Sequence, residues 1–499
     1  MKFGADKVAA DVEGLHVFKS HLGPKPRPRT LRLAGTVVIV LLTVILAALT
    51  VLLSGHLSRH SHRPRGFYHN ITDVQGLNCI DSASYAGHIG LKGDTNKSPK
   101  RSFFWYFEAE HEAETAPVIL TIGGGPGTSA MMNTLWGQSP CLATEDGLAP
   151  NPHRWTERHH LIALDHPVGT GFSYGTMVNN SRSAAYDVYD FLQKFFVLFP
   201  HLARNQFVVS GGSYGGVYVP NIATVIQEQN LLIKSGAGQP GAIPINLEAL
   251  ILSNPLSNPM SHWTWLLQYR CEEHNLYNST ECRTMYSKLP ACLESIDMAF
   301  NVPTLENRLT SLDLCGYLNS GDMHGVSTED IRRPCVPDPE QPAGCHPEFT
   351  WVQDIFANKT VRHGLGLSPD LNFTSLDMDV NAAFAAEGDL LRPHHLMYPP
   401  LLSTGIRLLH YIGAQDANCA WPGVFSFLKL LKTPFQADFL AAPDVPWPTK
   451  DVATVRTVGG GAGSMAYILV QEAGHFTVKD QPALAKKIVE HWIANKPFF

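Results

Sequence analysis

Short apolar runs that alternate with amphipathic stretches organise the chain from about residue 70 onward. Apolar side chains three and four positions apart mark residues 183–199 and 482–493 as helices. The strand candidates are apolar on both faces, and they are residues 102–107, 117–122, 160–165, 206–210, 247–253, 406–412 and 466–471. Strands buried on both faces need helices on either side, so the pattern predicts an α/β fold with a mostly parallel sheet.

The periodic pattern breaks between about residues 260 and 395, where Cys, Pro and polar residues become frequent, as is typical of an insertion or cap. The cysteines of this stretch are Cys271, Cys282, Cys292, Cys315, Cys335 and Cys345. Clustered cysteines predict disulfides in an oxidising compartment, and the odd total of nine leaves one thiol unpaired. A zinc site is the alternative, but no CxxC pair or short Cys/His spacing is present, so we expect no metal and no cofactor.

No charged residue occurs from residue 33 to residue 53. At about 1.5 Å of rise per residue this length crosses the hydrocarbon layer, so residues 33–54 are predicted to form a transmembrane signal anchor. A cleaved secretory signal fits less well, because its apolar region would be shorter and closer to the start. The predicted regions are a basic cytoplasmic tail at 1–32, the anchor at 33–54, a His- and Arg-rich stalk at 55–69 and a hydrolase domain at 70–499.

Basic residues are more frequent before the predicted anchor than after it, which favours a cytoplasmic N-terminus. Six glycosylation sequons follow the anchor, at Asn70, Asn96, Asn179, Asn278, Asn358 and Asn372. Sequons and clustered cysteines both predict that the hydrolase domain is lumenal or extracellular, in the secretory pathway, the vacuole or at the cell surface.

Composition excludes several other classes of protein. With 44% hydrophobic and 16% charged residues, the chain is globular rather than disordered. A net charge of -6 and a pI near 6.4 leave no basic face for a phosphate backbone, so no nucleic-acid partner is expected.

One serine between glycines lies directly after the strand candidate 206–210. Residues 211–215 read Gly-Gly-Ser-Tyr-Gly, and a helix-compatible segment follows them. A GxSxG sequence between a strand and a helix predicts a sharp turn that exposes the serine hydroxyl near a helix N-terminus. Ser213 is therefore the candidate nucleophile, and a flexible glycine loop is the alternative.

A serine hydroxyl needs an imidazole to take its proton and a carboxylate to orient that imidazole. Asp416 and His475 each follow a strand candidate late in the chain. Both lie where the carboxyl end of a strand meets a loop, which is where sheets of this kind carry their chemistry. They are the expected acid and base, with Asp165 and Asp480 as alternative carboxylates.

The reaction also needs two N–H groups that face the developing oxyanion. Tyr214, the residue after the candidate nucleophile, is expected to supply one, and the glycine loop at residues 123–127 the other. A phosphate cradle is the rival interpretation of this loop, but no GKS/T follows and the spacing is not GxGxxG.

Around these residues the chain resembles the serine carboxypeptidase family, from about Cys79 to the C-terminus. The matching segments, in order, are SYAGHIGL, RSFFWYFEAE, PVILTIGGGPGTSA, NPHRWTERHHLIALDHPVGTGFSYG, VVSGGSYGG, GIRLLHYIGAQDANCAW and EAGHFTVKDQP. The resemblance implies an α/β-hydrolase fold with a helical, disulfide-bearing cap at about 260–395. It also implies a catalytic triad of Ser213, Asp416 and His475.

By the same resemblance, Gly125 and Tyr214 would donate the oxyanion N–H groups. Asp165 falls in a structural segment of the family, which weakens its candidacy as the catalytic acid. Cys419 lies where several relatives have an unpaired cysteine, so it is the candidate for the free thiol.

The chain departs from the family at the site for the substrate's C-terminal carboxylate. Members usually bind that group with one Asn and two Glu side chains, and the matching positions here are Gly123, Gly137 and Gly212. Burying a carboxylate without partners costs several kcal/mol, so its recognition is expected to be changed. The backbone of the loop, including Gly124, could still contact an anion, and Lys479 is a candidate replacement charge.

The sequence thus predicts a membrane-anchored serine carboxypeptidase-like hydrolase that cleaves peptides at the C-terminus, with altered carboxylate recognition. An esterase or acyltransferase with the same triad is the alternative. A catalytically idle binding protein is the third hypothesis.

Overall fold

The computed structural model describes residues 66–321, 323–335 and 345–499. The predicted tail at 1–32, the predicted anchor at 33–54 and residues 55–65 of the predicted stalk lie outside these residues. Within the described residues, no helix combines the length and the apolar character that a membrane span requires.

A large twisted sheet forms the centre of the described part. Its strands, in spatial order, are β1 (His69–Asp73), β2 (Ser84–Gly90), β3 (Lys100–Phe107), β7 (His160–Leu164), β4 (Val118–Ile122), β9 (Phe207–Ser213), β10 (Leu247–Pro255), β11 (Arg407–Gly413), β14 (Met465–Val470), β13 (Ala453–Val458) and β12 (Val445–Pro446), and β8 (Tyr174–Gly175) pairs with β3. The strands from β7 to β14 in this order are mutually parallel, and antiparallel strands flank them. The prediction of a mostly parallel sheet is confirmed, and each of the seven strand candidates overlaps one of these strands.

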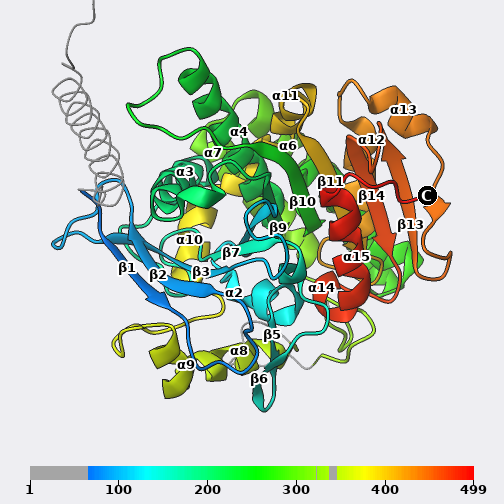
Figure 1. Cartoon of the computed structure of the whole chain (residues 1–499). Helices are drawn as coiled ribbons and strands as arrows, with labels where there is room; N and C mark the ends of the chain where they lie inside the picture. Colours follow the sequence, from blue (N-terminus) through cyan, green and yellow to red (C-terminus); the bar gives the residue numbers. More distant parts are fainter. Residues whose placement is uncertain (1–65, 322, 336–344) are drawn as a thin grey trace, which may run out of the picture. The chain divides into compact units, whose positions relative to one another are not determined.

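Helices cover both faces of this sheet (Figure 1). Helices α3 (Ser181–Leu198) and α4 (Gly215–Lys234) pack on one face, and α15 (Pro482–Ile493) packs on the other. Adjacent residues of β10 point to opposite faces, as in any strand. Leu250 belongs to the apolar cluster under α3 and α4, and Ile251 belongs to the cluster under α15. Burial on both sides explains why these strands are apolar at almost every position.

Between β10 and β11 the chain forms a helical insertion, which includes the stretch where the periodic pattern breaks. Its helices are α5 (Pro259–Gln268), α6 (Ser279–Asn301), α7 (Leu305–Gly316), α8 (Glu348–Ala357), α9 (Lys359–Gly364), α10 (Met378–Ala386) and α11 (Tyr398–Ser403). Part of it has its own apolar cluster, which includes Leu267, Met285 and Ile296. Among the described residues, the remaining α-helices and strands are α2 (Met131–Asn133), β5 (Cys141–Thr144), β6 (Gly147–Pro150), α12 (Trp421–Leu430), α13 (Gln436–Ala441) and α14 (Thr477–Asp480).

Disulfides staple this insertion, as predicted. The bonds are Cys271–Cys282, Cys292–Cys315 and Cys335–Cys345 in the insertion, and Cys79–Cys141 outside it. Cys419 is the free thiol, and it is buried. Such bonds persist only in an oxidising environment, which agrees with a lumenal or extracellular location for the described part.

Candidate active site

Ser213 occupies a tight turn between β9 and α4. Its φ of 56° lies in the left-handed region, which is uncommon for a residue with a side chain. The strand ends at Ser213 and the helix begins at Gly215, so the turn joins them within two residues. This is the strained strand-to-helix geometry that lifts a serine hydroxyl above the sheet edge.

Neighbouring parallel strands bring three further polar residues to the same edge. The pairing of β9 with β10 places Ser213 opposite Pro255, directly after Asn254. Strands β11 and β14 pair up to Gly413 and Val470, and the loops that follow them carry Asp416 and His475. The carboxyl ends of parallel strands meet at one edge, which brings together residues far apart in the sequence.

The imidazole of His475 and the carboxylate of Asp416 are hydrogen-bonded, with 2.7 Å between Nδ1 and Oδ2. Asp416 is fully buried and His475 nearly so. The N–H groups of Asn418 and Cys419 donate to the other carboxylate oxygen at 2.8 and 3.0 Å, and Asn254 Nδ2 donates to Oδ2 at 2.7 Å. With its donors fixed in this way, the carboxylate holds Nδ1 as the protonated nitrogen and leaves Nε2 to accept a proton.

The electrostatics around His475 favour its charged form. Burial lowers the pKa of His475, but the charge of Asp416, its hydrogen bond and the charge of Glu329 together raise the pKa above its ordinary value. The site thereby stabilises an imidazolium, the state that forms when a serine proton is accepted.

The glycine loop packs directly against the serine turn. A Cβ added at Gly124 would lie 2.7 Å from the Cβ of Ser213 and 3.2 Å from the backbone nitrogen of Tyr214, so only glycine fits there. Among the described residues, the N–H groups of Gly125 and Tyr214 have no protein acceptor. Two unpaired backbone donors beside a serine are the requirement for binding an oxyanion.

A segment of the insertion, Ser327–Arg333, hydrogen-bonds the loop after β11 and the loop after β14; we name it the crossing segment. Its Thr328 carbonyl accepts from the N–H of Ala417 at 3.0 Å, and its Glu329 carbonyl accepts from the N–H of His475 at 2.6 Å. The cap therefore fixes the loops that carry Asp416 and His475.

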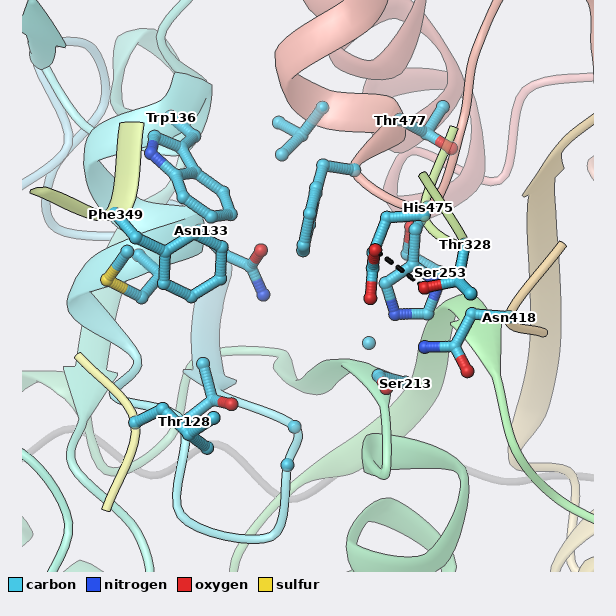
Figure 2. A pocket seen from close by; sticks show the side chains of 18 of the residues that line it. Thr128, Asn133, Trp136, Ser213, Ser253, Thr328, Phe349, Asn418, His475 and Thr477 are labelled. Carbon is cyan, nitrogen blue, oxygen red and sulfur yellow. Dashed lines mark hydrogen bonds between the residues drawn. The ribbon is translucent and has the colours of Figure 1, made fainter. Parts of the chain in front are cut away.

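A cavity of about 530 Å³ (Figure 2) is lined by Ser213, His475 and Thr328, whereas Asp416 lies behind His475 and outside the lining. Figure 2 shows Ser213 and His475 on one side, with Trp136, Phe349 and Asn133 on the other. Met132, Met323, Val326, Leu376, Phe476 and Val478 add apolar surface. The cavity thus combines a polar reacting corner with a largely apolar opposite wall, the usual composition of a small-molecule or peptide site.

The four glycines expected to touch substrate divide into two groups. Gly124 and Gly212 line the cavity, whereas Gly123 and Gly137 do not. A Cβ at Gly123 would lie 1.9 Å from the carbonyl oxygen of Thr128, and one at Gly137 would lie 2.8 Å from that of Val478. At Gly212 the nearest atom is the carbonyl oxygen of Ser253 at 3.2 Å, so a side chain there needs only a small adjustment.

The alternative carboxylates have other partners. Asp165 is fully buried and accepts from Ser129 Oγ at 2.5 Å and from the N–H of Phe172 at 2.8 Å, and its burial raises its pKa to about 7. Asp480 accepts from the N–H of Gly474 at 2.8 Å. Neither hydrogen-bonds His475, so both organise loops around the site.

Two other side chains near the site have defined roles. Lys479 pairs with Glu348 at 3.0 Å and does not line the cavity, so the structure does not place this candidate charge where it could meet a substrate carboxylate. The ligand-type atoms of Cys419, Asp416 and His475 lie within 4.8 Å of one another. Burial raises the pKa of the Cys419 thiol well above its ordinary value, and the charge of Asp416 adds to this, so the thiol stays protonated.

Asn254 and Glu329 are site residues that the sequence interpretation missed. Asn254 directly follows a strand candidate at 247–253, so its place at a carboxyl strand end was a usable signal. Glu329 comes from the Cys- and Pro-rich stretch, where no periodicity indicates which residue faces the sheet.

Comparison with known proteins agrees with this geometry. Residues 76–495 match the family model for serine carboxypeptidase, which shows the family. The chain is 31% identical over 436 residues to serine carboxypeptidase-like 49 of Arabidopsis thaliana, covering 85% of this chain and 80% of that protein. It is 28% identical over 440 residues to carboxypeptidase Y homolog A of Paracoccidioides lutzii, covering 85% and 75% respectively.

Among solved structures, KEX1(delta)p, a prohormone-processing carboxypeptidase from Saccharomyces cerevisiae, superposes with a TM-score of 0.71 at 22% identity, covering 85% of this chain and 96% of that one. This likeness shows the fold, and the expected α/β-hydrolase fold is confirmed. The chain therefore belongs to the serine carboxypeptidase family, as a serine-type hydrolase.

Proposed function

We propose that Ser213, His475 and Asp416 form the catalytic triad of an acyl-enzyme mechanism. The observation that carries the proposal is the 2.7 Å hydrogen bond between His475 Nδ1 and Asp416 Oδ2, beside a cavity that also exposes the strained Ser213. Nε2 of His475 accepts the proton of Ser213 Oγ as that oxygen forms a bond to the substrate's carbonyl carbon. The N–H groups of Gly125 and Tyr214 stabilise the resulting oxyanion.

Collapse of the tetrahedral intermediate breaks the bond to the leaving group, which takes the proton from the imidazolium. Water then loses a proton to His475 and attacks the acyl carbon, and Ser213 recovers its proton as the acid product leaves. Asp416 stays ionised and keeps the imidazole oriented throughout.

The substrate we propose is a peptide cleaved at its C-terminus, recognised differently from the substrates of most relatives. Three features support altered recognition. Gly123, Gly137 and Gly212 carry no side chain that could bind a terminal carboxylate. The described residues that line the cavity include no Lys or Arg. The polar groups that remain on the opposite wall are neutral, and they include Asn133 and Gln138.

An esterase or acyltransferase reaction on the same triad is the second candidate. The mostly apolar wall around Trp136 and Phe349 favours it, because an ester or an acyl group needs no charged partner.

The test uses the full-length chain and three substrates: a blocked dipeptide with a free C-terminus, the same peptide amidated, and an aryl ester. A peptidase with altered recognition cleaves the peptide with a free C-terminus faster than the amidated peptide, but by a smaller factor than an enzyme that has the usual carboxylate ligands. Indifference to the carboxylate, together with fast ester turnover, contradicts the exopeptidase and supports the esterase. A phosphonofluoridate should label Ser213 and leave the Ser213→Ala variant unlabelled. Absence of both turnover and labelling would indicate a binding protein and overturn the proposal.

We also propose that the chain is a single-pass membrane glycoprotein with regions at 1–32, 33–54, 55–69 and 70–499. All six sequon asparagines, Asn70, Asn96, Asn179, Asn278, Asn358 and Asn372, are exposed, which is what the glycosylation machinery requires. Glycosidase treatment should increase the electrophoretic mobility of the chain, and alkaline carbonate should fail to release it from membranes. Release by carbonate would contradict the anchor.

A further inference from the structure

Glu329 is the single ionisable carboxylate among the described residues that line the cavity. It lies in the crossing segment, and its carbonyl accepts the backbone N–H of His475 at 2.6 Å. Its charge is close enough to raise the pKa of His475. The carboxylate of Glu329 therefore belongs to the same cavity as Ser213 and His475.

The carboxylate of Glu329 is oriented by its neighbours but is only partly engaged. Oε2 accepts from Thr328 Oγ1 at 2.8 Å and from Ser327 Oγ at 3.1 Å. Within the described part of the chain, Oε1 has no donor, and no Lys or Arg forms an ion pair with the group. The side chain retains 24% exposure, so it can reach a group inside the cavity.

Two basic side chains that interact electrostatically with Glu329 are either neutral or bonded elsewhere. His346 Nε2 lies 4.0 Å from Oε2, but burial and the charge of Lys479 lower the pKa of His346, which keeps it neutral. The guanidinium of Arg270 is buried and donates to the carbonyl of Ala417 at 2.7 and 2.9 Å. Glu329 thus keeps an acceptor oxygen free for a positive group that arrives with the substrate.

Aromatic rings line the same cavity as this carboxylate. Phe476 packs 5.2 Å from the ring of His346, which itself contacts Glu329, and it stacks edge-on with Trp136 at 4.6 Å. A surface of this kind accommodates the methylene stem of a long basic side chain or the face of a guanidinium. A substrate carboxylate, by contrast, would meet a like charge.

We propose that Glu329 makes this cavity a site for a positively charged substrate group, a guanidinium or an ammonium, next to the bond that is cleaved. This inference rests on the proposed function for its catalytic part. The charge of Glu329 attracts the cation, and the apolar wall receives the stem. A neutral group of the same shape would gain the packing without the ion pair.

The binding test does not depend on catalysis. Benzamidine, a planar aryl cation, and the neutral benzamide are titrated into the full-length chain by calorimetry. Benzamidine should bind at least about tenfold more tightly, which corresponds to about 1.4 kcal/mol. The Glu329→Gln variant keeps the acceptor for Thr328 and Ser327 and should remove this difference, whereas Glu329→Asp should retain part of it. If Glu329→Gln prefers benzamidine over benzamide as strongly as the wild type does, the inference is overturned.

Turnover gives a second readout. Blocked dipeptides carry either arginine or its neutral isostere citrulline, on either side of the scissile bond. At one of these positions kcat/KM should favour arginine by about tenfold or more, and Glu329→Gln should bring that ratio near one. The ratio cancels any general effect of the charge on His475.

Glu472→Gln is the matched control and should leave the ratio unchanged. This carboxylate lies close to His475 in sequence, is 70% exposed and pairs with Arg332 outside the cavity.

The two proposals fail in different ways. Charge-selective binding without turnover and without labelling of Ser213 would contradict the proposed chemistry and support the cationic site. Turnover without charge selectivity that depends on Glu329 would contradict the cationic site and leave the proposed triad chemistry standing.

Discussion

The two sides of the cavity differ in how completely their polar groups are paired. On the reacting side, Asp416 accepts four hydrogen bonds, and the crossing segment holds the backbone of His475. On the other side, Trp136 Nε1 and Gln138 Oε1 are buried without a partner in the described residues.

The two sides of the cavity are therefore under different constraints. A proton relay works only with fixed distances and tautomers, so each of its atoms is held by several others. A recognition wall can exchange its side chains while the chemistry opposite survives, since specificity is a difference in binding energies. We therefore expect substitutions on the reacting side to abolish all turnover, and substitutions on the opposite wall to change which substrate is used.

The largest expected effect comes from Asp416→Asn. The amide cannot hold His475 in the productive tautomer, so kcat should fall by about ten-thousand-fold for peptide and ester substrates alike. Steady-state kinetics on both substrates measures this. Asp480→Asn is the control, because Asp480 does not bond the imidazole, and it should cost far less. A comparable loss in both variants would return Asp480 to candidacy as the acid.

Gly123→Ala should destabilise the fold. Its Cβ would lie 1.9 Å from the carbonyl oxygen of Thr128, and relieving such an overlap moves the backbone, at an expected cost of about 3 kcal/mol in unfolding free energy. Denaturant unfolding measures this cost. Gly215→Ala is the matched control next to Ser213, because no atom lies within 4 Å of its added Cβ, and it should be neutral. Equal stability of the two variants would show that the loop adjusts freely.

Under the proposed altered recognition, Gly212→Glu should strengthen the recognition of a terminal carboxylate. The added Cβ has a 3.2 Å contact with Ser253 and lies 3.9 Å from Asn133 Nδ2, so the side chain fits within the cavity with a small shift. The preference for a free peptide over its amide should rise about tenfold, or about 1.4 kcal/mol, at a pH that protonates the new acid. Gly212→Gln separates hydrogen bonding from acidity. An unchanged preference in both variants would show that the altered recognition lies elsewhere on the wall.

The smallest effect concerns pH. The proposed base acts only when His475 is neutral, so kcat/KM should rise with pH through a pKa above the ordinary value of 6.5, because Asp416 and Glu329 raise that pKa. Removing one of these charges with Glu329→Gln should move the midpoint to lower pH. A pH–rate profile on the neutral aryl ester measures both. A midpoint that moves upward in the variant would contradict the electrostatic account.

Much of the reacting side could be predicted from the sequence, because its residues follow strands. Ser213, Asp416 and His475 each come directly after an apolar run, and parallel strands necessarily bring their carboxyl ends together. The antiparallel strands β2 and β13 were missed, because residues 84–90 contain two glycines and residues 453–458 have polar side chains between the apolar ones and no uninterrupted apolar run.

The sequence by itself determined the α/β fold, the cysteines that form disulfides and the identity of the residues at the strand ends, because hydrophobic periodicity and order along the chain specify these locally. Only the tertiary structure decided that Glu329 enters the cavity, that Asn254 bonds Asp416, and that Gly123 and Gly212 differ in the space around them. Those facts depend on how an irregular segment folds over the sheet and on which carbonyl groups approach a backbone, and such long-range contacts leave no periodic trace in the sequence.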